Sequence, residues 1–243
     1  MTKRFRPEKA YKNLRFLNSD NARTIRILSE YLEPLSRLES QKVNSTVLFL
    51  GSARALPRGR KEILTPYYWQ AEELAYRLAK WAMGVKTRGK SHVVCTGAGP
   101  GIMEAANRGA RRAGGMSIGM NISIPHEQFP NPYIPPEMSF VFHYFFMRKF
   151  WLISKARAAV AFPGGYGTLD EVFEILTLLQ AEKISKSKFR FFLYGKDYWK
   201  RALNLEFLLE AKAISPEDLD LFTPCNTPGE AFRLLKAHLT GGR

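Results

Sequence analysis

Short apolar runs alternate with longer amphipathic segments along most of the chain. Runs rich in β-branched or aromatic side chains, typical of buried parallel strands, occur at 46–50, 92–96, 117–124, 140–146, 159–162, 188–194 and 219–223. Apolar residues at helical spacing occupy 65–83, 102–113, 147–156, 197–211 and the segments that begin at Thr168 and Thr227. Strands that alternate with helices predict an α/β fold, a Rossmann-like parallel sheet with helices on both faces and right-handed crossovers.

The first 44 residues differ from the rest. Residues 1–20 are basic and lack a clean period, whereas 21–40 carry leucine and isoleucine at helical spacing. Pro34 is expected to kink or interrupt that helix. We therefore divide the chain into a basic, partly helical N-terminal extension at 1–44 and a Rossmann-like domain at 45–243. The apolar stripe of the extension must be buried against its own domain or a second subunit, and nothing in it suggests a site.

The stretch 159–171 concentrates the candidate chemistry. An apolar strand ends at Pro163, and Gly164, Gly165 and Gly167 let the backbone turn where side chains would clash. Thr168 is then predicted to open a helix. Free N–H groups and the positive end of a helix dipole make such a turn an anion site, with phosphate as its natural ligand.

The same residues fit a simpler interpretation. Thr168-x-x-Glu171 has the spacing of a capping box, in which the glutamate reaches back to the N-cap amide. A cap does not require side chains to be absent from three preceding positions. The glycines therefore favour phosphate binding, and Thr168 can serve both purposes.

Two further turns follow predicted strands. Gly51-Ser52-Ala53-Arg54 follows the first, where Arg54 could reach a phosphate or ribose or could be an exposed loop arginine, and Gly97, Gly99 and Gly101 follow the second. Ligands of open parallel sheets bind beyond the carboxyl ends of the strands, so both turns are candidate walls of a cleft. Ile102 replaces the third glycine of a dinucleotide-binding fingerprint, and the chain has no Walker A motif, which argues against an ATPase.

Arg148 and Lys149 stand among aromatic residues at 145, 146, 150 and 151. An apolar neighbourhood makes unpaired charge costly, so a phosphate or carboxylate partner is expected. The alternative is that the side chains snorkel to the surface. This is plausible for Lys149, but less so for Arg148 and Lys149 at the same time. The proline-rich connection 125–137 contains His126-Glu127-Gln128, and irregular loops at strand ends often carry function.

Composition narrows the classes of function. The net charge is +15, and residues 1–61 hold 14 Lys and Arg against 5 Asp and Glu, which favours nucleotides, nucleic acid or an acidic surface, or is only a solvated basic face. No nucleic-acid-binding motif accompanies the charge, so nucleic acid ranks last. Apolar stretches are too short for a membrane span and no signal peptide is evident, which predicts a cytoplasmic protein without membrane association. Cys95 and Cys225 are isolated, so we expect no disulfide and no metal site.

Taken together, the motifs resemble those of the Lonely Guy (LOG) family. Residues 163–171, Pro-Gly-Gly-Tyr-Gly-Thr-Leu-Asp-Glu, match its PGGxGTxxE signature, and Arg148-Lys149 stands where the family has its Arg-Lys pair. The turns at 51–54 and 97–104 are similar to its first two ligand turns. The resemblance extends over residues 45–240. Such proteins often carry the label "lysine decarboxylase-like", but nothing in this sequence indicates a pyridoxal-phosphate site, so we discard that label.

The resemblance implies a phosphoribohydrolase, which cleaves the N-glycosidic bond of a nucleoside 5′-monophosphate to free base and ribose 5-phosphate. A purine or N6-substituted adenine is the implied base, as in cytokinin activation. Arg148 and Glu171 would be the catalytic pair. The substrate would be bound by Gly51, Ser52, Arg54, Gly97, Gly99, Gly101, Lys149, Gly164, Gly165, Tyr166, Gly167, Thr168 and Thr177, with Glu127 a weaker candidate.

The residue types agree with that chemistry. Oxocarbenium character on the sugar is stabilised by a carboxylate, here Glu171, which the helix dipole is expected to keep ionised. Arg148 offers permanent charge to a phosphate or to the departing base. No cofactor is needed. The resemblance also implies a homodimer or larger assembly. A non-catalytic nucleotide-binding sensor or carrier on the same fold is the alternative, because fold does not fix function.

Overall fold

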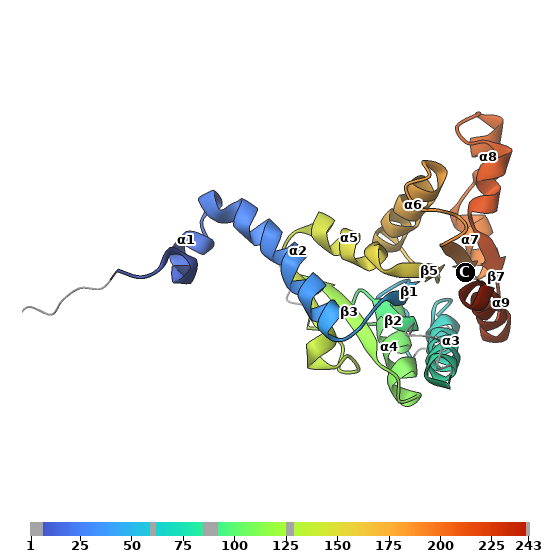
Figure 1. Ribbon diagram of the computed structural model, residues 1–243. Coiled ribbons are helices and arrows are strands. Elements are labelled where there is room, and N and C mark those ends of the chain that lie inside the picture. Colours follow the sequence, from blue (N-terminus) through green and yellow to red (C-terminus); the bar gives the residue numbers. More distant parts are fainter. Residues whose placement is uncertain (1–6, 59–61, 85–91, 125–128, 242–243) are drawn as a thin grey trace, which may run out of the picture.

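One parallel sheet organises the molecule. The computed structural model describes residues 7–58, 62–84, 92–124 and 129–241. Within them, seven parallel strands lie in the order β4-β3-β2-β1-β5-β6-β7 (Figure 1). The strands are β1 Ser45–Leu50, β2 His92–Thr96, β3 Ser117–Ile122, β4 Ser139–Phe142, β5 Ala156–Ala161, β6 Arg190–Tyr194 and β7 Thr223–Cys225. The predicted α/β fold with a Rossmann-like parallel sheet is confirmed.

Helices cover both faces of the sheet. The connecting helices are α3 Thr65–Gly84, α4 Ile102–Arg112, α5 Phe145–Ser154, α6 Tyr166–Gln180, α7 Lys196–Ala202, α8 Leu205–Glu210 and α9 Pro228–Gly241. Alternate residues of β1 belong to two separate cores. Leu48 and Leu50 pack in the core shared with α5 and α6, and Val47 and Phe49 in the core shared with α3, α4 and α9. Burial on both faces explains why the central strands are continuous apolar runs.

The order of the strands reverses between β1 and β5. From β1 the chain continues to β2 on one side, and from β5 to β6 on the other. The turns that follow these two adjacent strands therefore diverge, and they leave a crevice at the carboxyl edge of the sheet, where open α/β sheets bind ligands. The glycine turn at 163–167 and the turn at 51–54 are the two turns in question.

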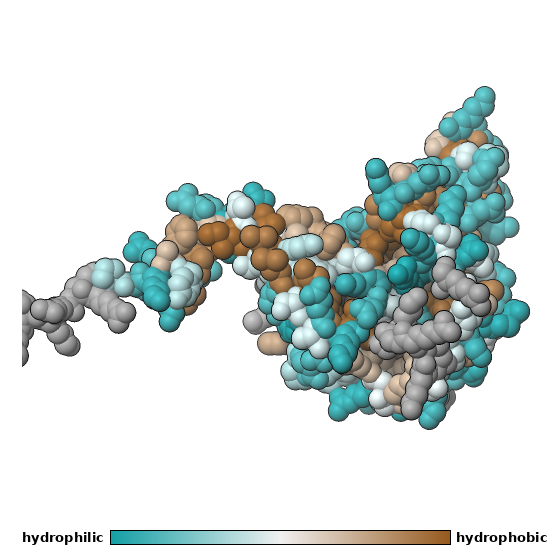
Figure 2. Space-filling model, in the orientation of Figure 1, coloured by the Kyte–Doolittle hydropathy of each residue, from teal (hydrophilic) through white to brown (hydrophobic). Residues whose placement is uncertain are grey.

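The N-terminal extension projects from the sheet (Figure 1). It contains short helical turns, η1 Ala10–Lys12, α1 Leu14–Leu17 and η2 Asp20–Ala22, and then the long helix α2 Arg23–Ser40. Helix α2 runs through Pro34 without interruption, contrary to one of the two outcomes expected for that proline. Its C-terminal half is docked, with Leu38 buried in the core, while Figure 2 shows apolar side chains along the helix, and Ile25, Leu28 and Leu32 are exposed.

Several element boundaries differ from the sequence-based expectation. The aromatic run at 140–146 splits into β4 and the first turn of α5, so Arg148 lies inside that helix and does not open it. The predicted helix 197–211 is two helices, because the Asn204 side chain accepts a hydrogen bond from the N–H of Phe207 and caps a new one. The segment 216–221 is a 3-10 helix, η4, capped by Ser215 and Asp218, and the last strand is β7. Cys225 lies in β7 and is buried.

None of the helices in the described ranges is long and apolar enough to cross a membrane.

Candidate active site

The glycine turn after β5 leads directly into α6. Gly165 is the N-cap of that helix and Tyr166 its first residue, so the helix begins two residues earlier than predicted from Thr168. No described group accepts a hydrogen bond from the backbone N–H groups of residues 165–168. A helix N-terminus with free N–H groups favours an anion.

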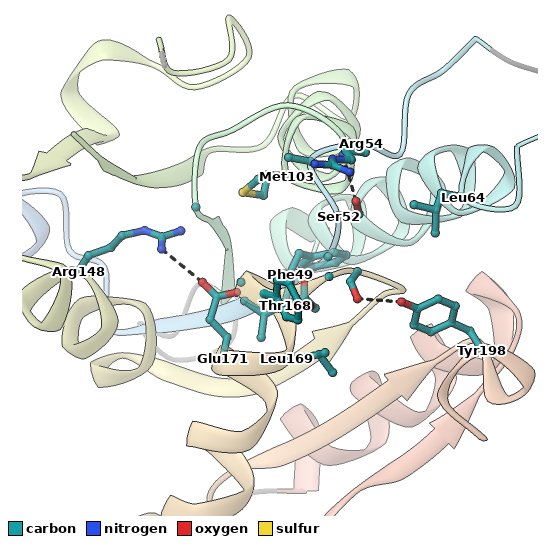
Figure 3. Close-up of a pocket in the computed structure, with 18 of the residues that line it drawn as sticks. Phe49, Ser52, Arg54, Leu64, Met103, Arg148, Thr168, Leu169, Glu171 and Tyr198 are labelled. Carbon is teal, nitrogen blue, oxygen red and sulfur yellow. Dashed lines mark hydrogen bonds and ion pairs between the residues drawn. The ribbon is translucent and has the colours of Figure 1, made fainter. Parts of the chain in front are cut away.

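The early start of α6 excludes the capping box, which was the simpler interpretation of Thr168 and Glu171. With Tyr166 at the first position, Glu171 is the sixth residue of the helix and lies more than one turn beyond the N-cap. The structure shows no side-chain cap at Gly165. Because the glycines allow the backbone to enter the helix at Tyr166, the Glu171 carboxylate points elsewhere, toward Arg148 (Figure 3).

Ser52 joins three turns at the carboxyl edge. Its N–H donates to the carbonyl of Pro163 (3.0 Å), and its carbonyl accepts from the N–H of Ile102 (3.1 Å) at the start of α4. Its hydroxyl accepts from the N–H of Arg54 (3.0 Å). A Cβ atom on Gly164 would lie 2.9 Å from the Ser52 nitrogen and against the hydroxyl of Thr168. The turns meet closely because the residue at 164 has no side chain.

Arg148 is held in a space that Gly97 leaves open. The Arg148 side chain is 11% exposed, and its Nε donates to the carbonyl of Met120 (2.9 Å) on β3. A Cβ atom on Gly97 would collide with Nη2 of Arg148 and would lie 2.8 Å from the sulfur of Met103. The second glycine turn thus makes room for a guanidinium, a role that its sequence did not reveal.

Arg148 and Glu171 form a buried pair (Figure 3). Nη1 of Arg148 lies 3.5 Å from Oε1 of Glu171, whose side chain is 14% exposed. Burial raises the pKa of Glu171 from its ordinary value of 4.5 to about 7; the Arg148 charge opposes this shift and Asp170 adds to it. Desolvation outweighs the favourable charges at this depth, so the helix dipole does not keep the pKa of Glu171 at its ordinary value.

Lys149 has a different environment from its neighbour. Its Nζ lies 3.0 Å from Oδ2 of Asp170 and 3.2 Å from Oε2 of Glu174, on the side of α6 away from the cavity. It connects α5 to α6. The partner predicted for the two cations is thus a carboxylate in each case, Glu171 for Arg148 and Asp170 with Glu174 for Lys149.

A cavity of about 760 Å³ opens between the turns. Its volume falls within the range of small-molecule sites. The predicted residues that line it are Gly51, Ser52, Arg54, Gly97, Arg148, Gly164, Gly165, Tyr166, Gly167, Thr168 and Glu171. The structure thus brings together at one cavity the three glycine turns and the Arg148–Glu171 pair.

The remaining predicted residues lie elsewhere. Gly99 and Gly101 belong to the second turn but do not line the cavity. The carbonyl of Gly99 accepts a hydrogen bond from the side-chain amide of Asn131, and a Cβ atom on Gly101 would collide with the backbone carbonyl of Ser52. Thr177 is exposed on α6 and Lys149 faces the outer side, and neither lines the cavity. Glu127 is outside the described residues. The assignment of these residues to the site stays a prediction.

Sequence analysis missed the apolar and aromatic part of the wall. Those residues are Phe49, Leu50, Ile63, Leu64, Met103, Phe145, Leu169 and Tyr198. Tyr198 donates from its hydroxyl to the carbonyl of Gly164 (2.8 Å) and holds the glycine turn from α7 (Figure 3). One signal was available: α7 follows β6, which lies beside β5, so its first turn must lie at the same edge of the sheet.

Comparison with known proteins identifies the family. A model of the family described as "Possible lysine decarboxylase" matches residues 103–235, more than half of the chain. The chain belongs to this family. The family is LOG-like, which confirms the resemblance carried by the motifs. No described residue that lines the LOG-like cavity is a lysine, so no described amine there could form a Schiff base.

Solved structures with the LOG-like fold include cofactor carriers. The protein TM1055 shares 21% identity at a TM-score of 0.52 and covers 79% of this chain and 98% of its own. The molybdenum cofactor binding protein from Rippkaea orientalis shares 21% identity at a TM-score of 0.50, covering 80% and 95%. The Moco carrier protein from Chlamydomonas reinhardtii shares 18% identity at a TM-score of 0.52, covering 81% and 98%. At such identities the likeness shows the fold alone. A search of curated proteins gave no match.

Proposed function

We propose that this protein hydrolyses the N-glycosidic bond of a nucleoside 5′-monophosphate, with a purine or N6-substituted adenine as the base. One observation carries the proposal. A buried arginine and a carboxyl group with a pKa near neutrality stand together at a cavity that also contains a helix N-terminus with free N–H groups. A 5′-phosphate would occupy the N-terminus of α6. The sugar would then lie near Glu171, three to six residues along the same helix.

The reaction divides between the two side chains. Water adds to C1′ as the bond from C1′ to the base nitrogen breaks, and the bonding electrons leave with the base. The Glu171 carboxylate stabilises positive charge on the ribose and takes the proton of the water; a group with a pKa near 7 suits such transfer. Arg148 stabilises negative charge on the departing base or the phosphate. The departing base takes up a proton from solvent and Glu171 releases the proton it took from water, so the products are free base and ribose 5-phosphate.

A panel of nucleoside 5′-monophosphates tests the proposal. Each is incubated with the purified protein and scored for free base and for ribose 5-phosphate. Release of both products in equal amounts, lost in Arg148→Met and Glu171→Gln, supports the hydrolase. Absence of turnover with every purine and pyrimidine monophosphate, in protein that binds them, would refute it.

A second candidate is binding without hydrolysis. Two proteins of the same fold are described as a molybdenum cofactor binding protein and a Moco carrier, so this fold serves carriers as well. Free N–H groups and glycine turns are sufficient for a carrier that holds a phosphorylated ligand. A carrier does not require a carboxyl group beside Arg148, which is why we place hydrolysis first. Ligand binding by calorimetry that is unchanged in Glu171→Gln, without turnover in the wild type, favours the carrier.

A further inference from the structure

The N-terminal extension makes a polar contact with the helix that carries Arg148. Between the end of β4 and the start of α5 lie His143 and Tyr144, and no side chain of the turn itself caps α5. Glu30, on α2, supplies the missing acceptor. Its Oε1 accepts from the N–H of His143 (2.7 Å) and its Oε2 from the N–H of Tyr144 (3.2 Å). A carboxylate at a helix N-terminus is favoured both by hydrogen bonding and by the helix dipole.

Tyr144 connects this contact to Arg148. Its N–H is held by Glu30, and its carbonyl accepts the backbone N–H of Arg148 (3.2 Å). A single residue therefore separates the Glu30 carboxylate from the backbone of the arginine. The aromatic rings of Phe145 and Phe146 on the same turn are about half exposed, so side-chain packing contributes less there than in the core.

A second set of contacts fixes the next turn of α5 to the same point of α2. The indole N–H of Trp151 donates to the backbone carbonyl of Glu30 (2.9 Å). The ring of Tyr31 packs against Phe150 and Trp151, with centroids 5.7 and 5.8 Å apart. Helix α2 thus holds α5 on both sides of Arg148 in the sequence.

The contact between Arg148 and Glu171 is sensitive to the position of α5. At 3.5 Å the two charged atoms are further apart than in a close charge-assisted hydrogen bond of 2.7–2.9 Å. On its other side, the Arg148 side chain donates to the carbonyl of Met120, and its guanidinium lies in the space that the missing side chain of Gly97 leaves open. Because Arg148 belongs to α5, a small displacement of the first turn of this helix would change the distance between the guanidinium and Glu171.

We infer that Glu30 of the N-terminal extension is a positioning residue for Arg148, holding the first turn of α5 so that the guanidinium stands at its working distance from Glu171. The kinetic consequence rests on the proposed hydrolase. The position of Arg148 relative to Glu171 does not depend on that proposal. Among the described residues, the hydrogen bonds of Glu30 reach His143, Tyr144 and Trp151, none of which lines the cavity.

The kinetic test compares three full-length variants. Glu30→Ala removes both acceptors, Glu30→Gln keeps one acceptor oxygen, and Glu39→Ala is the control, since Glu39 is exposed on the same helix and its side chain has no described partner. We expect Glu30→Ala to lower kcat about tenfold or more with a smaller change in KM, because a displacement of about 1 Å can cost that much while the glycine turn is untouched. Glu30→Gln should recover much of the loss, and Glu39→Ala should match the wild type.

A second measurement does not depend on turnover. The charged and titratable groups near Glu171 are Arg148 and Lys149 from α5, Asp170 and Glu174 from α6, and Cys95 from β2. Arg148 lowers the pKa of Glu171, so its displacement should raise that pKa. We expect carbon NMR of the Glu171 carboxyl, assigned with Glu171→Gln, to titrate at higher pH in Glu30→Ala and normally in Glu39→Ala.

The outcomes separate the two ideas. If the wild type hydrolyses no nucleotide, the proposed function fails, and the titration still tests Glu30. An unchanged Glu171 titration in folded Glu30→Ala would overturn the inference. Should Glu30→Ala not fold, Glu30→Gln replaces it, with a smaller upward shift expected and no shift counting against the inference.

Discussion

Glu171 is the residue whose environment departs most from its ordinary chemistry. The carboxyl group is buried beside an arginine, yet its pKa is raised to about 7, since the cost of desolvation exceeds the attraction of Arg148. Near neutral pH both protonation states are populated. Enzymes shift carboxyl groups in this direction when they use them to transfer protons.

Replacement of Glu171 by glutamine tests its role directly. We expect Glu171→Gln to reduce kcat by about a thousandfold or more, since in the proposed reaction the carboxylate both stabilises the sugar and accepts a proton. Nucleotide binding should persist, because the turn at 163–167 is unchanged. Kinetics and calorimetry on the same preparation provide the check, and normal turnover in the variant would remove Glu171 from the mechanism.

The raised pKa also predicts how stability depends on pH. Between pH 4.5 and about 7 the folded protein binds more protons at Glu171 than the unfolded chain does, so this residue makes stability fall as pH rises. At 1.36 kcal/mol per pKa unit, the loss approaches about 3 kcal/mol. Denaturant unfolding at pH 5 and pH 8 should show this decrease in the wild type and a smaller one in Glu171→Gln. Equal decreases in both would show that Glu171 titrates normally.

At the scale of elements, the glycine turns are spacers for charged groups. Gly97→Ala would place a methyl group against Nη2 of Arg148, so the guanidinium must move away from Glu171. We expect a loss of about a hundredfold in kcat/KM, because misplacement by about 1 Å can cost that much. Gly229→Ala is the matched control, since a Cβ atom there meets nothing within 4 Å. Activity assays after thermal melts separate misplacement from unfolding, and full activity in Gly97→Ala would contradict the role given to this turn.

The turn before α6 predicts a requirement for the 5′-phosphate. The free N–H groups at 165–168 and the positive end of the helix offer their binding energy to an anion, which a nucleoside lacks. We expect AMP to be cleaved at least about a hundredfold faster, in kcat/KM, than adenosine, since losing two or three charge-assisted hydrogen bonds costs several kcal/mol. Equal rates for the two would refute the assignment of this turn as a phosphate site.

Sequence patterns predicted the elements whose signal is local. The central strands are buried on both faces, so they appear as apolar runs. The succession of strands and glycine turns along the chain could therefore be predicted from the sequence. The run at 140–146 was ambiguous, because alternation in β4 passes directly into the exposed aromatic residues of α5. Where a polar side chain resets the backbone, as Asn204 does between α7 and α8, the capping residue was present in the sequence but was not weighed.

Long-range contacts explain most of what the sequence did not reveal about the site. The residues of all three glycine turns and of the Arg148–Glu171 pair could be identified from motifs. That Lys149 faces Asp170 and Glu174, or that Glu30 caps α5 from more than 110 positions away, depends on how helices lie against each other. Burial of Glu171 has the same origin, which is why the rise in its pKa could not be predicted from the sequence.

At the scale of the whole molecule, apolar side chains remain exposed on the side formed by the neighbouring helices α2, α5 and α6. Phe145, Phe146 and Phe150 on α5 and Phe173 on α6 are each about half exposed, in addition to the stripe on α2 (Figure 2). Large contiguous apolar patches mark interaction surfaces. We expect a homodimer or larger assembly in which this side is shared between subunits, and light scattering at micromolar concentration should show it. A monomer under those conditions would contradict this prediction.

Trp151 lies at the contact between α2 and α5, so its fluorescence depends on that contact. Its ring is 3% exposed, and its indole N–H is held by the carbonyl of Glu30. Tryptophan emission shifts to longer wavelength when the ring passes from a dry to a wet environment. Lifting α2 from the domain would expose this ring to water. Trp199 would stay dry, because it is buried and its indole N–H donates to the carbonyls of Ala161 and Tyr194. Trp151 is therefore an intrinsic fluorophore at the junction between the extension and α5, and the shift in its emission can report the state of that junction in real time.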